Sequence, residues 1–137
     1  MKPETRELAR YRMERAGQTR EEAEILFSNG KYNGAMNRIY YSIFYAVGAV
    51  LILEGLSSAK HSGTISLFLS RFVKENKAPE ETGKFLRDMF KFRSRGDYDD
   101  FTEFTSEQVS ESLRELDVQL STLELLLEKM MREDTQF

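Results

Sequence analysis

The stretch that decides the fold is NGAMNRIYYSIFYAVGAVLILEG, residues 33–55. At a helical period its apolar residues cover nearly the whole circumference of a helix instead of one face. A helix that is apolar nearly all round is normally buried on all sides. Asn37 and Arg38 interrupt the run, and the uncharged part, residues 39–53, is too short to cross a bilayer. The stretch therefore predicts a central helix against which other helices pack, and no membrane span.

Arg38 is predicted to lie in the core or at the rim of a cleft. A buried guanidinium without a counter-charge is very costly. We therefore expect an anionic group near Arg38, which is either a carboxylate of this chain, such as Asp97 or Asp88, or a ligand. Two arrangements stay open. Arg38 either belongs to an internal polar network that the Tyr41 hydroxyl joins, or it faces the same cleft as Arg93.

The rest of the chain predicts further helices around this one. Apolar residues recur at helical spacing in four more segments, and strand-like alternation is almost absent. The first of these segments shows a stripe that continues across Gly17, which favours a single helix. The stripe consists of Leu8, Tyr11 or Arg12, Arg15, Ala23, Leu26 and Phe27. We expect an all-α, up-and-down bundle of four to five helices in a single domain, residues 1–137. The expected helices cover residues 2–28, 33–55, 62–76, 79–93 and 105–132.

The last predicted helix has the clearest pattern. Thr105 and Gln108 fit a capping box at its start. Leu125 and Leu126 lie off its apolar seam, where they could meet a second surface, such as another subunit. The seam itself has heptad spacing and consists of Val109, Leu113, Leu116, Leu120, Leu123, Leu127 and Met130.

The composition limits the kinds of chemical site that the chain can form. The chain has no cysteine, which excludes disulfides and thiolate metal sites and favours a reducing compartment, so we expect a cytoplasmic protein. Scattered carboxylates show no metal-ligand spacing, and no cofactor motif is present, so neither a metal nor a cofactor is expected. Residues 60–95 are basic, whereas the acidic charge lies after Gly96. This asymmetry argues against broad nonspecific nucleic-acid binding, but it leaves room for a small phosphate site.

The best candidate site lies at the end of the fourth predicted helix and contains Arg93, Arg95, Asp97 and Tyr98. Arginine holds phosphate through a planar fork of donors, and tyrosine can stack on a base. The alternative interpretation is a helix C-terminus at which arginines complement the helix dipole, Gly96 is the C-cap and Arg–Asp pairs form locally.

His61 is the only histidine. Catalysis by a lone histidine needs an orienting partner and a nearby reacting group. Because it stands beside Lys60 at the start of a predicted helix, we interpret it as a structural hydrogen-bonding residue.

Three stretches together resemble the HEPN domain family, and the resemblance covers nearly the whole chain. They are GAMNRIYY at residues 34–41, Lys60-His61, and FRSRGDY at residues 92–98. The resemblance implies a helical bundle that commonly forms a homodimer. It also implies a minimal nucleotidyltransferase partner, often in a toxin–antitoxin pair, and metal-independent ribonuclease activity carried by an arginine followed after a short spacing by a histidine.

Arg93 matches the arginine of that motif, but no histidine follows it, and Tyr98 stands near the expected position. In partnered members a tyrosine just past the histidine receives AMP, and Tyr98 lies near that place too. The resemblance thus implies catalytic roles for Arg93 and Tyr98. Four further polar residues are expected to bind the ligand. We expect nucleotide or RNA binding to survive and cleavage to be weak or absent. The alternative is a non-enzymatic helical protein that dimerises or docks a partner. The expected ligand-binding residues are Asn37, Arg38, Arg95 and Asp97.

Overall fold

The computed structural model describes residues 1–135, which form five α-helices and one short π-helical segment. No strand is present in this part of the chain, so the predicted all-α bundle is confirmed. The π-helical segment, Leu69–Val73, directly continues the third helix. The helices are α1 (Pro3–Ser28), α2 (Tyr32–Leu53), α3 (His61–Phe68), α4 (Glu80–Tyr98) and α5 (Ser106–Thr135).

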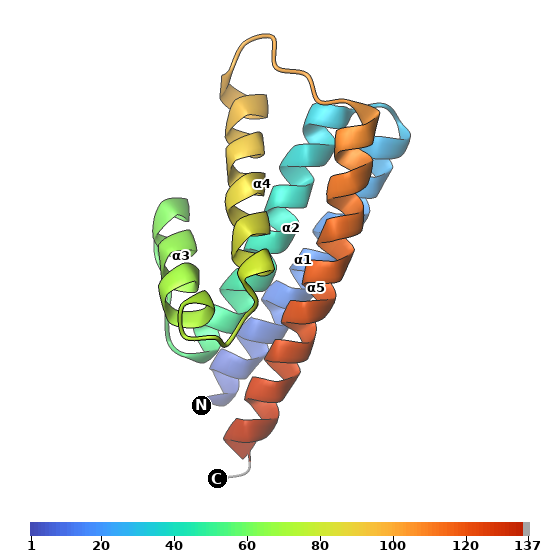
Figure 1. The fold of residues 1–137 in the computed structure, drawn as a ribbon. Helices are drawn as coiled ribbons and strands as arrows, with labels where there is room; N and C mark the ends of the chain where they lie inside the picture. The colour runs from blue at the N-terminus through green and yellow to red at the C-terminus, as the bar shows by residue number, and fades with distance from the viewer. Residues whose placement is uncertain (136–137) are drawn as a thin grey trace.

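The long helices run alternately up and down, and α2 lies in the middle of them (Figure 1). α1, α3, α4 and α5 all contact α2. Helix α3 stands to the side, where it packs on α2 and α4. The start of α1 and the end of α5 lie at the same end of the bundle, and the amino group of Met1 pairs with Asp134 of α5 at 3.4 Å.

The central position of α2 follows from its composition, because about half of its side chains are buried and most of these are apolar. In the part of the chain that the structure describes, α2 is the one helix long and apolar enough to span a membrane, but the bundle already uses its apolar surface. Of the two positions expected for Arg38, the core is excluded, since 30% of its side chain is exposed at the rim of the bundle. The buried residues of α2 are Ala35, Met36, Ile39, Tyr40, Ser42, Ile43, Ala46, Val47, Ala49, Val50, Leu51 and Leu53.

Helix α1 is continuous through Gly17 as predicted, but its predicted inner face is only partly right. Ala23 is buried and Leu26 packs against the core, as expected. Leu8 and Tyr11 are exposed by 38% and 54%. Small residues face the core instead, and a smooth face of this kind lets α1 approach α2 closely. The buried residues of α1 are Ala9, Ala16, Thr19 and Ala23.

Helix α4 is longer than predicted. It runs through Gly96 to Tyr98, and Asp99 is its C-cap, so the predicted end at Arg93 is wrong. Gly96 serves close packing rather than the cap, because a Cβ at this position would lie 2.9 Å from the Phe104 ring. Asp97 and Tyr98 therefore lie on the last helical turn instead of in a loop.

Helix α5 begins at the predicted capping box. The Gln108 amide donates to Thr105 Oγ1 at 3.1 Å, and the Thr105 amide donates to Gln108 Oε1 at 2.8 Å. The predicted seam is buried as far as Leu127, and its next buried residue is Met131 rather than Met130. An α-helix drifts against a strict heptad repeat, which explains this change of spacing.

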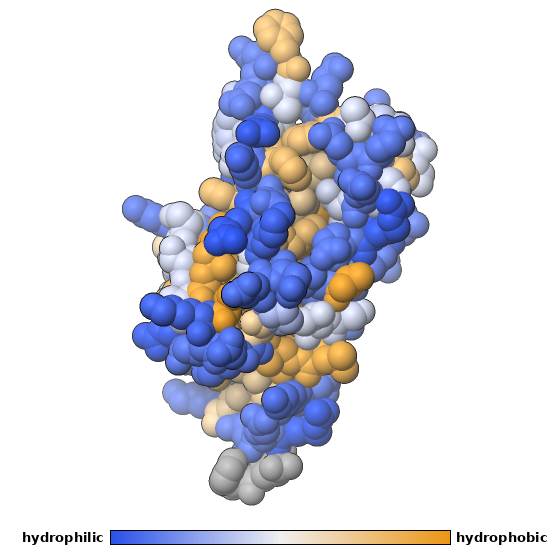
Figure 2. All heavy atoms as spheres, in the orientation of Figure 1, coloured by the Kyte–Doolittle hydropathy of each residue, from blue (hydrophilic) through white to orange (hydrophobic). Residues whose placement is uncertain are grey.

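The surface exposes both hydrophilic and apolar side chains. In the view of Figure 2 most of the visible face is hydrophilic, and apolar atoms are exposed in separate areas. The most exposed large apolar side chains include Phe101, Leu125, Tyr98 and Val118. Isolated apolar residues on a surface are ordinary, but Tyr98 and Phe101 follow one another closely at the end of α4.

Candidate functional site

Tyr41 of α2 joins two arginines from different parts of the chain. Arg93 of α4 donates a hydrogen bond from Nη2 to the Tyr41 hydroxyl at 2.9 Å, and its guanidinium lies 5.5 Å from the centre of the ring. The guanidinium of Arg38 lies 4.9 Å from the same ring centre. Guanidinium groups are attracted to the faces of aromatic rings at such distances. Of the two arrangements that the sequence left open, the structure thus brings Arg38 and Arg93 to the same side chain.

Asp97 connects the two helices at this point. It lies one turn after Arg93 on α4, and its Oδ2 is 3.1 Å from Arg93 Nε. The same oxygen accepts a hydrogen bond from Asn37 Nδ2 of α2 at 2.9 Å. Arg93 Nε is buried and has no hydrogen-bond partner, so its contact with Asp97 is one of charge and not a well-aligned hydrogen bond.

We call Asn37, Arg38, Tyr41, Arg93 and Asp97 the arginine–tyrosine cluster. Burial opposes the charge of Arg93, but Tyr41, Tyr98 and Asp97 outweigh this effect and raise the pKa of Arg93. The guanidinium therefore stays charged over the whole physiological pH range. It offers a fixed cation with a spare donor, which is the arrangement that binds a phosphate oxygen.

Arg38 has a different anionic partner from the two considered. It lies 3.7 Å from Glu22 of α1 and donates two hydrogen bonds to Asn37 Oδ1, at 3.1 and 2.8 Å. It reaches Asp97 only through Asn37. Asp88 pairs with Lys84 on the surface of α4. A direct Arg38 pair with Asp97 or Asp88 is therefore wrong, and Glu22 supplies the expected counter-charge.

Tyr98 joins the site at its outer edge. The guanidinium of Arg93 lies 5.6 Å from the centre of the Tyr98 ring, and 73% of this residue is exposed. Arg95 is also exposed, and no contact between it and the cluster is recorded in residues 1–135. Residues two apart on a helix face different directions, whereas Arg93 and Asp97, four apart, share a face. Tyr98 thus contacts the cluster through Arg93, whereas the predicted site residue Arg95 points away from it.

His61 lies closer to this site than its sequence position suggests. Its Nδ1 is 2.8 Å from the hydroxyl of Tyr40, so the expected structural hydrogen bond exists. Its ring also lies edge-on to Tyr41, with 5.7 Å between the ring centres. Sequence reasoning missed this proximity because His61 precedes Arg93 by one helix and a connector. The only signal for this proximity was the place of His61 at the start of α3, which packs beside the aromatic residues of α2.

Asn33 was also missed by the sequence analysis. At the start of α2 it donates to the Thr102 carbonyl at 2.8 Å and accepts a hydrogen bond from the Phe104 amide at 3.1 Å. These two bonds attach the segment after α4 to α2. Phe101, between them and α4, is fully exposed and has a φ of 64°. A left-handed conformation is rare for an aromatic residue, and the Asn33 bonds help to hold it.

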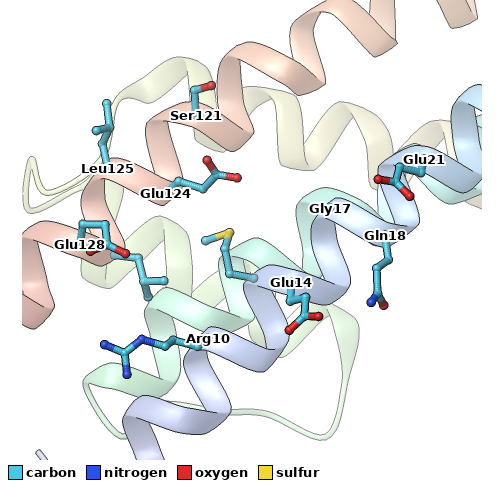
Figure 3. Close-up of a pocket in the computed structure, with 11 residues that line it drawn as sticks. Arg10, Glu14, Gly17, Gln18, Glu21, Ser121, Glu124, Leu125 and Glu128 are labelled. Atoms are coloured by element: carbon cyan, nitrogen blue, oxygen red, sulfur yellow. The ribbon is translucent and has the colours of Figure 1, made fainter.

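A groove of about 880 Å³ lies elsewhere, between α1 and α5 (Figure 3). Met13 and Leu125 contribute apolar surface, and Arg10 is its one cation. The other charged residues of the lining are acidic and would repel phosphate. The acidic residues of the groove are Glu14, Glu21, Glu124 and Glu128.

In residues 1–135 no group of three metal-ligating side chains is found.

Comparisons with known proteins agree on one family. The model of the HEPN domain matches residues 9–124. The chain is 39% identical to a UPF0332 protein of Thermotoga maritima, over 94% of this chain and 98% of that protein. It is 33% identical to "Putative toxin MJ0142" of Methanocaldococcus jannaschii, over 70% of this chain and 65% of that protein. It is 35% identical to a UPF0332 protein of Gloeobacter violaceus, over 82% and 86% of the two chains.

Proposed function

Because this chain belongs to the HEPN domain family, we propose that it is a toxin-like HEPN module that binds the phosphate groups of single-stranded RNA. Arg93 holds the phosphate, and Arg38 adds positive charge from α2. The single observation that carries this proposal is the pair of arginines on Tyr41, one of which has a buried Nε without a hydrogen-bond partner. A phosphate oxygen that displaced the Asp97 carboxylate from Arg93 Nε would satisfy that donor.

The exposed face of α4 favours a polymer over a single nucleotide. Four cations at helical spacing lie on this face, and all are exposed. A row of this kind attracts successive phosphates of a nucleic-acid backbone. Tyr98 and Phe101, both exposed at the end of the same helix, are suited to stacking on unpaired bases, which supports a single-stranded ligand. The cations are Lys84, Arg87, Lys91 and Arg95.

A minimal nucleotidyltransferase is the proposed partner, in a toxin–antitoxin-like pair. Tyr98 is the proposed acceptor of AMP because its side chain is largely exposed and touches Arg93. Transfer of AMP from ATP to the Tyr98 oxygen would release pyrophosphate and leave an anionic group beside Arg93, which would then compete with RNA. Native mass spectrometry of the coexpressed pair tests this: one AMP added to wild type and none to Tyr98→Phe is expected.

The protein is further proposed to act as a homodimer in the cytoplasm. Exposed Val118 and Leu125 on α5 offer apolar surface that a second copy could cover. Light scattering at micromolar concentration should give twice the mass of the chain, and a monomer would contradict the dimer.

A second function, docking of a protein partner without catalysis, is favoured by the groove between α1 and α5. Leu125 at this groove is 72% exposed. Leu125→Ser should abolish capture of the partner and leave RNA binding unchanged if the two functions use separate surfaces.

Fluorescence anisotropy with a labelled single-stranded RNA tests the main proposal. Arg93→Ala is expected to weaken binding at least about tenfold, because a charge-assisted contact to phosphate contributes about 1.5–3 kcal/mol. Arg114→Ala, which removes an exposed charge from α5, is the matched control and should stay within about twofold of wild type. Equal affinities for the Arg93 and Arg114 variants would contradict the proposal.

A further inference from the structure

The groove between α1 and α5 has two walls, each made by one face of a long helix (Figure 3). On α1 the lining residues 10, 14, 17 and 21 are spaced four, three and four apart, and on α5 residues 121, 124, 125 and 128 line the other side. Residues three or four apart lie on the same face of a helix. The groove is therefore a continuous trough along two helices.

Part of the lining is apolar. Met13 of α1 is half-buried and Leu127 of α5 is buried, whereas Leu125 is 72% exposed. Gly17 adds no side chain, and a Cβ built on it would meet nothing within 4 Å. Val118 precedes Leu125 by about two turns and is also exposed, so the apolar stripe of α5 continues beyond the groove. An occupant that covers this stripe must be an extended element and not a small molecule.

Both walls carry carboxylates. Glu14 and Glu21 stand on α1, and all four acidic residues of the groove are exposed. Glu124 and Glu128 stand on α5. In residues 1–135 no ion pair within 4 Å is recorded for any of the four. Arg10 is the one cation of the lining. A trough whose acidic charges lack ion-pair partners attracts a positively charged partner.

A helix fits this trough better than an extended peptide does. The backbone donors and acceptors of the walls bond within α1 and α5, so an extended peptide would find no free edge to pair with. A helix satisfies its own backbone and packs its side chains between the ridges of the two walls. Amphipathic helices bind grooves in this way through apolar anchors at positions i, i+3, i+4 and i+7. The acidic walls then favour lysine or arginine on the flanks of that apolar stripe.

We propose that the groove between α1 and α5 binds an amphipathic helix of a partner protein. The apolar stripe of this helix lies on Met13 and Leu125, and its flanking lysines or arginines face the four glutamates. The inference rests on the second function proposed above, the docking of a protein partner, and it names the chemistry of the segment that docks. RNA binding is a separate matter, because the groove shares no residue with the arginine–tyrosine cluster.

A second copy of this chain is a poorer occupant of the groove. A twofold contact here would place the same glutamates against each other, and like charges in contact oppose association. The exposed face of α4 has the right sign, but no large apolar residue between Lys84 and Arg95 is exposed. That face therefore has no anchor to place on Leu125. The homodimer proposed above would compete for Leu125, and the charges of the groove favour the basic helix.

Two synthetic peptides serve as probes of the full chain. Both are amphipathic helices of about 18 residues, or five turns, with one stripe of leucines. Lysines flank the stripe in one peptide and glutamates flank it in the other. The methyl group of Met13 reports occupancy of the groove by NMR, and Met36, fully buried on α2, is the reference. The lysine peptide is expected to shift the Met13 signal saturably, and the glutamate peptide to leave it in place. Met13→Leu assigns the signal.

Variants of α5 test the charges and the anchor by fluorescence anisotropy with the lysine peptide. Glu124→Gln/Glu128→Gln should weaken binding about fivefold, as expected when two exposed ion pairs are lost. Glu107→Gln/Glu111→Gln is the matched control, because it removes two exposed carboxylates with the same spacing from the same helix. These lie about 20 Å or more along α5 from Glu124, beyond a Debye length, so affinity should stay within about twofold. Leu125→Ser should also weaken binding, although it removes no charge.

The remaining outcomes overturn the proposal in different ways. A glutamate peptide that binds as tightly as the lysine peptide would refute the basic partner and leave the docking function standing. Equal losses in the two double variants would show attraction by net charge alone. A Met13 signal that moves without peptide as the mass doubles would show that a second copy fills the groove. If neither peptide moves Met13, the groove takes no helix, and the docking function is then judged by whether Leu125→Ser loses a native partner.

Discussion

The guanidinium groups of Arg38 and Arg93 lie 4.9 Å and 5.5 Å from the centre of one ring, that of Tyr41. The two residues come from α2 and α4, and each has a carboxylate near it, Glu22 and Asp97 respectively. The charges of the two arginines are thus balanced by two carboxylates when no ligand is bound. A bound phosphate must share Arg93 with Asp97, and this competition can be measured.

Asp97→Asn is expected to tighten binding of single-stranded RNA. The substitution removes the charge that competes for Arg93, and the amide oxygen can still accept the hydrogen bond from Asn37. A gain of about fivefold is expected, since partly exposed ion pairs are worth about 1 kcal/mol. Anisotropy titration measures the affinity. Asp117→Asn, which loses a surface pair with Arg20, is the control and should change little. Weaker binding by Asp97→Asn would show that the carboxylate positions Arg93 rather than competes with phosphate.

Two glycines in helix interiors should respond to alanine in opposite directions. Gly96→Ala places a Cβ 2.9 Å from the Phe104 ring and should lower the free energy of unfolding by about 1–3 kcal/mol. Gly17→Ala meets nothing within 4 Å on α1 and should raise it by about 0.5–1 kcal/mol. Urea unfolding of the two variants gives both values. A neutral Gly96→Ala would mean that Phe104 moves away freely.

The pH dependence of stability should carry a contribution from His61. Its pKa in the folded chain is lowered from 6.5, first by burial and then by Arg93. Below pH 6.5 the unfolded chain therefore binds more protons than the folded one, and stability rises with pH in this window. The contribution is complete above pH 6.5 and is lost as the pH falls through the folded pKa. Thermal unfolding of wild type and His61→Asn should differ by an amount that grows up to pH 6.5 and is constant above it. A constant difference at every pH would contradict a lowered pKa.

Asn33→Ala should release the segment after α4. It removes the bonds to the Thr102 carbonyl and the Phe104 amide, and losing such bonds costs about 1–3 kcal/mol. Hydrogen exchange at the Phe104 amide should become faster, and RNA binding should weaken because the last turn of α4 loses support. Asn29→Ala, which removes one exposed side-chain bond at the end of α1, should leave that amide unchanged.

Much of the fold could be predicted from residues 33–55, because an all-round apolar helix must lie at the centre of a bundle. Two features of the fold were predicted wrongly, and each error has a physical reason. The buried residues of α1 are three alanines and Thr19, and a search for large apolar residues passes over them. The end of α4 was placed too early because Gly96 resembles a C-cap, whereas the Phe104 ring is what excludes a side chain there.

Part of the candidate site could also be predicted from the sequence. Arg38 and Arg93 could be paired because each is an arginine next to apolar helix residues that must pack. His61 and Asn33 could not be assigned from spacing, because their partners lie on other helices. Which helix end meets which is decided by packing, and only the structure shows it.

The most direct test of the account is an NMR titration of the Arg93 side chain with single-stranded RNA. Arg93 Nε is buried without a hydrogen-bond partner in the free protein, so a bound phosphate oxygen should move its N–H signal strongly and saturably. Arg93→Lys, in which that signal is lost, assigns it. The account predicts that the Arg93 signal shifts with the affinity seen by anisotropy while that of Arg114 stays in place. RNA binding that leaves the Arg93 signal unmoved would contradict it.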